Sequence, residues 1–291
     1  MKTRTLGPFT VSAIGLSAMP MSFQPIPEDQ SMATIHAALD AGVTFIDTAD
    51  IYAPSWDTMG HNELLVARAL KSYGGSKDDL VIGTKGGITR AEGDVWGRDG
   101  SEQYLRSAVE KSLRNLEVDT IDLYQWHRPD RWKVYGEVIE TLAKLQTEGK
   151  IKAIGISNAD VEEIDVAIEV LGAGALASVQ NEFSPRYRSS EVELDHCAKN
   201  GIAFLPWSPL GGSGGAKEIG DRFAVIGAIA EAHGVSPQQV VLAWELGLAD
   251  SVIPIPGASR PESITDSVRA ADLDLSDDER ERISAINLGI R

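Results

Sequence analysis

Hydrophobic positions along the chain follow two alternating spacings. Short runs rich in β-branched and aromatic residues recur and are typical of buried strands; they read AIGLS, VTFID, LVIGTK, TIDLYQWH, IKAIGISN, LASVQ, IAFLPWS and SVIPIPG. Longer segments between them carry apolar residues at helical spacing, as in 101–116, where Ser101 is the expected N-cap. Because strands and helices alternate, the pattern predicts a parallel sheet covered by helices.

Eight such units in 291 residues favour an α/β fold of the (β/α)₈ barrel type over an open doubly wound sheet. The first 16 residues predict a β-hairpin, and SPQQVVLAWELGLA and LSDDERERISAI predict extra helices near the C-terminus, the second capped by Ser276. No linker-like stretch divides the chain. We therefore expect residues 1–291 to form a single barrel domain.

The charge balance limits the partners. The chain has 43 acidic and 27 basic residues, a net charge of −16, which argues against nucleic acid and anionic membrane surfaces. No run is long and apolar enough to span a bilayer, and the first residues make a poor signal peptide. A lone cysteine, Cys197, excludes an internal disulfide framework. The expectation is a cytoplasmic protein, either a monomer or a weak homo-oligomer.

Polar side chains gather where the expected strands end. Asp47 and Tyr52 follow the second strand, Lys85 ends the third and His127 ends the fourth. Active sites of such barrels lie at the carboxyl ends of the strands. An ammonium beside a phenol lowers the pKa of that phenol, and a carboxylate balances the ammonium. We interpret Tyr52 as a proton donor, Lys85 and Asp47 as the groups that tune it, and His127 as a hydrogen-bond donor to a substrate oxygen.

Seven motifs then occur in order over nearly the whole chain: FIDTADIY, GTKGG, LYQWHRPD, IGISN, SVQNEFS, PWSPLGG and IPIPGASR. Together they resemble the aldo-keto reductase family. The resemblance implies a (β/α)₈ barrel that uses NADPH to reduce aldehydes and ketones, and it assigns the same four catalytic residues. The segments WHRPD, TKGG and VWGRDG are most similar to a branch that reduces pyridoxal and general aldehydes.

The same resemblance implies NADP(H) as the cofactor and a set of residues that contact it. These are Ser157, Asn158 and Gln180 at the nicotinamide carboxamide, Trp207 stacked on its ring, Ser208, Pro209, Leu210 and Gly211 at the pyrophosphate, and Gly257, Ser259 and Arg260 at the adenosine phosphate. By position, Met19, Met21, Trp56 and Trp96 would line the pocket for a small carbonyl substrate.

Two alternatives remain open. A barrel hydrolase would pair Asp47 with Asp50, although Asp50 alone is more typical of a turn or cap. A redox-sensing regulatory subunit would bind the cofactor and turn over slowly. We expect no metal site, because the histidines lack partners at metal-ligand spacing, and His196 and Cys197 are adjacent on a helix and point in different directions.

Overall fold

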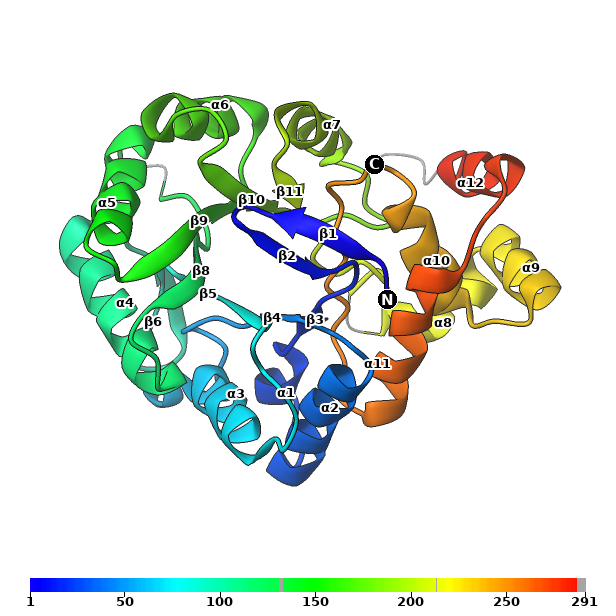
Figure 1. Cartoon of the computed structure of the whole chain (residues 1–291), viewed down its shortest axis with the longest axis horizontal. Coiled ribbons are helices and arrows are strands. Elements are labelled where there is room, and N and C mark those ends of the chain that lie inside the picture. The colour runs from blue at the N-terminus through cyan, green and yellow to red at the C-terminus, as the bar shows by residue number, and fades with distance from the viewer. Residues whose placement is uncertain (131–132, 213, 287–291) are drawn as a thin grey trace.

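Parallel strands form a closed ring surrounded by helices in the computed structural model, which describes residues 1–130, 133–212 and 214–286 (Figure 1). The main sheet has the order β11-β10-β9-β8-β5-β4-β3. Its strands are β3 (Leu16–Ser17), β4 (Phe45–Asp47), β5 (Val81–Gly86), β8 (Ile121–Trp126), β9 (Ile151–Ser157), β10 (Leu176–Gln180) and β11 (Ala203–Phe204). The predicted α/β barrel is confirmed.

The segment 251–257 closes the ring between the two edge strands. Parallel bridges join Val252 to Phe204 of β11 and Gly257 to Ser17 of β3. Towards β3 the segment contributes the carbonyl groups of Pro254 and Pro256, which accept hydrogen bonds from backbone N–H groups at 2.9 and 3.1 Å. Proline has no N–H to donate. The eighth strand therefore occupies the position that the sequence predicts but lacks a continuous ladder.

Six helices follow successive strands around the outside of the ring (Figure 1): α2 (Glu28–Asp40), α3 (His61–Ser72), α4 (Glu102–Leu116), α5 (Tyr135–Thr147), α6 (Val161–Leu171) and α7 (Glu191–Asn200). The remaining side carries α8 (Gly215–Arg222), α9 (Ala224–His233), α10 (Pro237–Leu246), α11 (Pro261–Val268) and α12 (Asp277–Ser284). Short turns are α1 (Pro20–Phe23), η1 (Trp56–Thr58) and η2 (Arg269–Asp272). Ser101 and Ser276 accept N-cap hydrogen bonds from Tyr104 and Glu279, so both predicted caps are confirmed.

The predicted N-terminal hairpin is present and closes one end of the barrel. Strands β1 (Thr3–Leu6) and β2 (Phe9–Ser12) cross the centre of the ring (Figure 1). Leu6 and Val11 pack in one buried cluster with residues from the beginnings of the barrel strands: Phe45, Val81, Leu123, Ala153, Ala177 and Ala203. The turn approaches the barrel closely, since a Cβ at Gly7 would lie 2.6 Å from that of Ala177. The hairpin therefore seals the amino-terminal end and leaves the other end for chemistry.

Two elements were not predicted. Strands β6 (Ile88–Ala91) and β7 (Val95–Arg98) form an antiparallel hairpin directly after β5. Its loop contains Gly93 and Asp94, both at positive φ, so the glycine between two short β-prone runs was the available signal. Helix α8 forms in a glycine-rich segment and was not predicted either; residue 213 of that segment lies outside the described residues.

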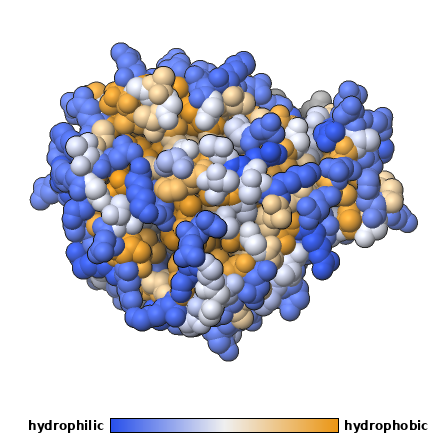
Figure 2. Space-filling model, viewed as in Figure 1, coloured by the Kyte–Doolittle hydropathy of each residue, from blue (hydrophilic) through white to orange (hydrophobic). Residues whose placement is uncertain are grey.

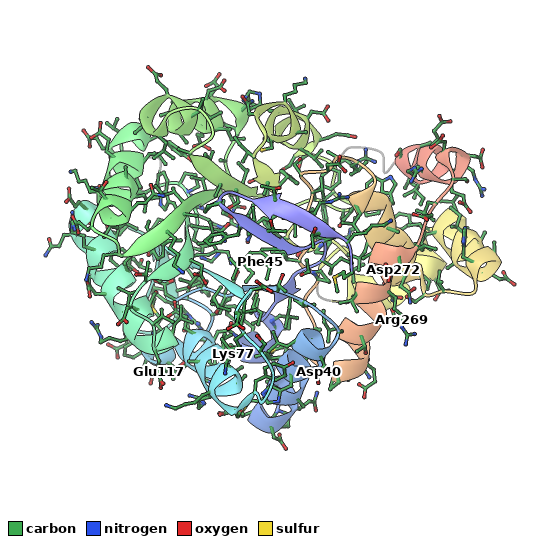
Figure 3. The ribbon with its side chains drawn as sticks, viewed as in Figure 1. Asp40, Phe45, Lys77, Glu117, Arg269 and Asp272 are labelled. Atoms are coloured by element: carbon green, nitrogen blue, oxygen red, sulfur yellow. The ribbon has the colours of Figure 1, made fainter. Side chains whose placement is uncertain are left out.

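Apolar and polar residues separate between the interior and the outer helices. Figure 3 places Phe45 inside the ring, whereas Asp40, Lys77, Glu117, Arg269 and Asp272 lie on its outer side. Hydrophilic residues surround the edge of the face in Figure 2, with hydrophobic residues between them. Among the helices that the structure describes, none combines the length and apolar composition required to cross a bilayer.

Phe45 gives a test of this interior. Its ring is fully buried against Gly15 and Gly83, where a Cβ would lie 2.8 and 3.1 Å from the ring. Phe45→Ala should lower the free energy of unfolding by about 3–5 kcal/mol, because neighbouring strands cannot collapse into the space. Urea unfolding followed by circular dichroism measures the change. The exposed control Val192→Ala should shift it by less than about 0.5 kcal/mol, and equal effects would contradict this packing.

Candidate active site

Lys85 lies at the centre of the strand ends and is completely buried. Its ammonium group donates to Asp47 Oδ2 at 2.6 Å, to the backbone carbonyl of Thr48 at 2.9 Å and to Tyr52 Oη at 3.1 Å. The three donors of a lysine are thereby used. Lys85 therefore joins a carboxylate from β4 and a phenol from the following loop.

The other carboxylate oxygen of Asp47 is held by two glutamines. Gln180 Nε2 donates to Oδ1 at 2.9 Å and Gln125 Nε2 donates to the same oxygen at 3.2 Å. We expected Gln180 only at the cofactor, and we assigned no role to Gln125. Strand alternation could have shown it, because Gln125 and His127 share a face. The glutamines fix Asp47 in the orientation that meets Lys85.

Tyr52 and His127 face one another at the barrel mouth. Their ring centroids lie 5.6 Å apart with the planes at 83°. Within the described residues the Tyr52 hydroxyl has one hydrogen bond, in which its oxygen accepts from Lys85. The hydroxyl hydrogen therefore remains available for donation. His127 Nδ1 is buried with no partner among the described residues.

The pKa shifts correct one expectation. Burial raises the pKa of Tyr52, and Lys85 lowers it by less, so the pKa lies above its ordinary value. The expectation of a lowered tyrosine pKa is therefore wrong for this structure. Burial alone would lower the pKa of Lys85. Asp47 and Tyr52 together raise this pKa by more than burial lowers it, so the ammonium form of Lys85 is favoured. Burial, followed by the charges of Lys85 and Arg128, holds the pKa of His127 well below its usual range. His127 is therefore a neutral imidazole at pH 7.

Asp50 lies in a turn, as expected, and is not a partner of Asp47. It is buried, its Oδ1 has no partner among the described residues, and burial followed by Glu63 raises its pKa well above the ordinary value. Its other electrostatic neighbours are Lys111 on helix α4 and Lys85. Asp47 instead turns toward the glutamines of β8 and β10. This arrangement gives a hydrolase no opposed pair of carboxylates.

Candidate cofactor residues at the ends of β9 and β10 contact the candidate catalytic residues directly. Asn158 donates to the carbonyl of His127 at 3.0 Å and to Ser157 Oγ at 2.9 Å. Ser157 Oγ donates to the carbonyl of Gln180 at 2.7 Å. Asn158 has a φ of 59°, in the left-handed region that asparagine tolerates. Its side chain is thereby turned into the rim instead of along the strand.

The remaining cofactor candidates follow the next two strands of the ring. Trp207, Ser208, Pro209, Leu210 and Gly211 come after β11, and Gly257, Ser259 and Arg260 come after the segment that closes the barrel. Ser208 and Gly211 both have positive φ, at 54° and 83°. Non-glycine residues with a strained backbone conformation are more frequent at functional sites. Gly257 and Arg260 are exposed, and no ion pair reaches the Arg260 guanidinium within the described residues.

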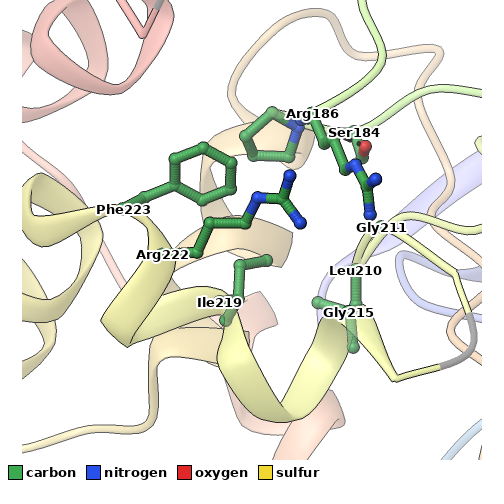
Figure 4. A pocket seen from close by; sticks show the side chains of 9 residues that line it. Ser184, Arg186, Leu210, Gly211, Gly215, Ile219, Arg222 and Phe223 are labelled. Carbon is green, nitrogen blue, oxygen red and sulfur yellow. Dashed lines mark hydrogen bonds between the residues drawn. The ribbon is translucent and has the colours of Figure 1, made fainter. Parts of the chain in front are cut away.

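Arg186 and Arg222, which were not predicted from the sequence, lie beside the loop 208–211. A small cavity is lined by residues from the loop after β10, the loop after β11 and helix α8: Ser184, Pro185, Arg186, Leu210, Gly211, Gly215, Ile219, Arg222 and Phe223. Figure 4 shows the guanidinium groups of Arg186 and Arg222 turned toward it. Neither has an ion-pair partner in the described part of the chain. This donor set suits the phosphates of a dinucleotide.

Exposed aromatic residues surround Tyr52 on the other side. Phe23 lies 5.8 Å from Tyr52 and 6.4 Å from Trp96, between ring centroids. The backbone N–H of Trp56 and the Arg90 side chain both donate to Asp94, which fixes the β6–β7 hairpin above the mouth. Met21, by contrast, is buried in the outer core, so its prediction as a pocket residue is wrong.

Cys197 plays no part in this site. It is buried on α7, and burial raises the pKa of its thiol to about 12. The adjacent His196 pairs with Asp165 at the surface, with 2.7 Å between Nε2 and Oδ1. The two side chains point in different directions on the helix, as predicted.

Comparison with known proteins identifies the class. The model of the Aldo/keto reductase family matches residues 13–288. An uncharacterized oxidoreductase of Schizosaccharomyces pombe is 33% identical over 94% of this chain and 86% of its own length. A 6-dehydroglucose reductase of Novosphingobium aromaticivorans is 35% identical over 81% of this chain and 78% of its own.

Solved structures agree. An aldo/keto reductase from Klebsiella pneumoniae, crystallised with NADP and acetate, superposes with a TM-score of 0.82, with 27% identity over 99% of this chain and 96% of its own. The barrel with its acid, amine, phenol and imidazole is thus an NAD(P)H-dependent oxidoreductase. The chain belongs to the aldo/keto reductase family.

The raised pKa of Tyr52 can be tested without a substrate. The difference in near-ultraviolet absorbance between the wild-type protein and Tyr52→Phe should show no phenolate at about pH 9, because burial keeps the phenol protonated. In denaturant the same pair should differ by one tyrosine as the pH rises through about 10. A phenolate signal in the folded wild type that Tyr52→Phe abolishes at about pH 9 would show that Lys85 outweighs burial.

Proposed function

We propose that the whole chain, residues 1–291, acts as one barrel domain that reduces the carbonyl group of a small aldehyde or ketone, with Tyr52 as the proton donor. The observation that carries the proposal is the Lys85 ammonium, which contacts Asp47 and Tyr52 together at 2.6 and 3.1 Å. The phenol accepts from Lys85 and keeps its own hydrogen for a substrate oxygen. The neutral imidazole of His127 faces the same space and orients that oxygen.

In the proposed reaction NADPH supplies the hydride that the carbonyl carbon receives. The residues of the chain provide everything else. As negative charge develops on the carbonyl oxygen, Tyr52 donates its proton and the positive charge of Lys85 stabilises the phenolate that remains. Asp47 keeps the ammonium in place, and Gln125 and Gln180 hold Asp47. Lys85 thus contributes most when charge has formed, which is the differential stabilisation that catalysis requires.

NADP(H) is the cofactor that the rim accommodates. The Klebsiella pneumoniae aldo-keto reductase has been solved with NADPH as well as with NADP. In this chain Ser157, Asn158 and Gln180 present amide and hydroxyl groups beside the catalytic residues. Arg186 and Arg222 add positive charge beside the loop 208–211. Arg260 follows the last strand, where its guanidinium would meet a 2′-phosphate. A pyridoxal-like or general aldehyde substrate stays a prediction.

Tyr52→Phe tests the proton donor. Turnover of an aldehyde panel that includes pyridoxal, methylglyoxal and aromatic aldehydes should fall by about 10²–10⁴-fold, which is the usual contribution of general acid catalysis. NADPH binding, followed by fluorescence quenching, should change by less than about twofold, because Tyr52 donates to the substrate and not to the nucleotide. Stopped-flow NADPH oxidation gives the rate.

The matched control is Tyr73→Phe, which removes a hydroxyl bound to Asp40 near the beginning of β5, at the opposite end of the barrel. It should keep wild-type turnover. Near-normal activity of Tyr52→Phe would overturn the assignment of the acid. Tight NADPH binding with negligible wild-type turnover on the whole panel would favour the redox-sensing regulatory subunit instead.

Two arginine variants separate the phosphate contacts. Arg260→Gln should weaken NADPH binding by about tenfold and leave NADH binding nearly unchanged, because only NADPH carries the 2′-phosphate. Arg222→Gln should weaken both nucleotides by a similar factor, because it lies beside the pyrophosphate loop. Fluorescence titration measures both, with exposed Arg114→Gln as the charge control. Equal losses for both nucleotides with Arg260→Gln would remove its 2′-phosphate role.

A further inference from the structure

A second, larger cavity lies near Tyr52. Its volume is about 310 Å³, and it is lined by Ile88, Trp96, Gly97, Arg98 and Arg128. Ile88 belongs to the same buried cluster as Tyr52, and Arg128 directly follows His127. The volume lies at the lower end of the range for small-molecule pockets. The cavity therefore adjoins the proposed proton donor and is large enough for part of a substrate.

The charged groups that line this cavity are both guanidinium groups. Arg98 Nη1 donates to the carbonyl of Pro129 at 2.9 Å. The other N–H groups of this guanidinium have no hydrogen-bond partner among the described residues. No hydrogen bond or ion pair reaches the Arg128 side chain from the described residues. Arg98 and Arg128 also repel one another: burial and then the charge of Arg98 lower the pKa of Arg128. Two neighbouring cations that have no ion-pair partner among the described residues favour an anion between them.

The surrounding charges leave this cation pair largely uncompensated. Glu182 is the carboxylate that acts on Arg128, yet no ion pair joins them within the described residues. Arg90, on the neighbouring strand of the hairpin, is paired with Asp94 and packs over the Trp96 ring at 4.8 Å. In a chain with a net charge of −16, Arg98 and Arg128 form a local concentration of positive charge, and neither has an ion-pair partner among the described residues. The cavity is therefore cationic where most of the surface is acidic.

The apolar wall indicates the rest of the ligand. Trp96 is 52% exposed and Phe23 is 41% exposed, and the two rings lie near one another beside Tyr52. Exposed aromatic residues around a cavity are typical of a ligand-binding groove. A planar apolar body would lie against Ile88 and Trp96 while its anionic group reaches the arginines.

We infer that this cavity selects a carbonyl compound with an anionic group, a carboxylate or a phosphate, on a planar apolar body, and that Arg128 binds the anion with help from Arg98. The inference rests on the proposed function, because the aldehyde of such a compound would point to Tyr52. A guanidinium fork binds two oxygens of a carboxylate or phosphate at once. Arg128 is thus a specificity-determining residue, separate from the groups that transfer the proton.

Three aldehydes with one ring test this inference. 4-Carboxybenzaldehyde carries a carboxylate, 4-formylphenyl phosphate carries a phosphate, and methyl 4-formylbenzoate is neutral. The wild-type protein should reduce at least one of the two anionic aldehydes with a KM about tenfold lower than that of the ester, at similar kcat. The ratio between the two anions identifies the preferred group. Raising the ionic strength should raise KM for the anion only.

Arg128→Gln should raise KM for the preferred anion by about tenfold or more and change KM for the ester by less than about twofold. Arg128→Lys should restore part of the difference, because it keeps the charge but loses the fork. Arg114→Gln, an exposed arginine on α4, removes the same charge elsewhere and should leave all three aldehydes unchanged. Arg128 forms no side-chain hydrogen bond with the described residues, so its replacement should not disturb folding.

The two proposals fail differently. If the wild type reduces the ester as efficiently as both anions, or if the preference survives in Arg128→Gln and in Arg98→Gln, the anion site is wrong and the reductase remains. If NADPH is oxidised with none of the three aldehydes or the wider panel, the proposed function is wrong and the anion site falls with it. A competition experiment is independent of turnover: benzoate should inhibit the wild type more strongly than benzamide, and Arg128→Gln should abolish the difference.

Discussion

The ammonium of Lys85 and the carboxylate of Asp47 meet where neither has more than 1% of its side chain exposed. Taking such a pair out of water costs several kcal/mol per ion, and only close contact and further hydrogen bonds compensate for the cost. The barrel supplies both. Strand β4 brings Asp47, β5 brings Lys85, and glutamines from β8 and β10 hold the other oxygen of the carboxylate. Every proposed catalytic role of Tyr52 depends on this arrangement.

The rim is divided between two arcs of neighbouring strands. The candidate catalytic residues lie at or after the ends of β4, β5 and β8, and the candidate cofactor residues lie at or after the ends of β9, β10, β11 and the closing segment. Asn158 links the arcs through the carbonyl of His127, and Gln180 links them through Asp47. Because these contacts cross from one arc to the other, the candidate cofactor residues and the proposed proton donor are held by one connected set of hydrogen bonds.

The sequence predicts the strands, the hairpin floor and the four groups around Lys85, because each follows from periodicity or from a polar residue at a strand end. The sequence does not predict properties that depend on which residues the fold brings together. The alternation of SVIPIPG indicates a strand, but two prolines limit its ladder. The phenol of Tyr52 lies beside an ammonium as expected, yet its depth outweighs that charge. Arg128 and Arg222 are ordinary charged residues in the sequence, and only the fold brings each beside another arginine.

The β1–β2 hairpin affects the end of the barrel from which Tyr52 can regain a proton. Leu6 and Val11 close the floor of the barrel with an apolar layer beneath the polar residues of the rim. This layer separates the interior ion pair from the amino-terminal end of the barrel. After each proposed turnover the phenol must regain its proton from the mouth side, through the same opening by which the alcohol leaves. Release of the alcohol and reprotonation of Tyr52 therefore both take place through the mouth of the barrel.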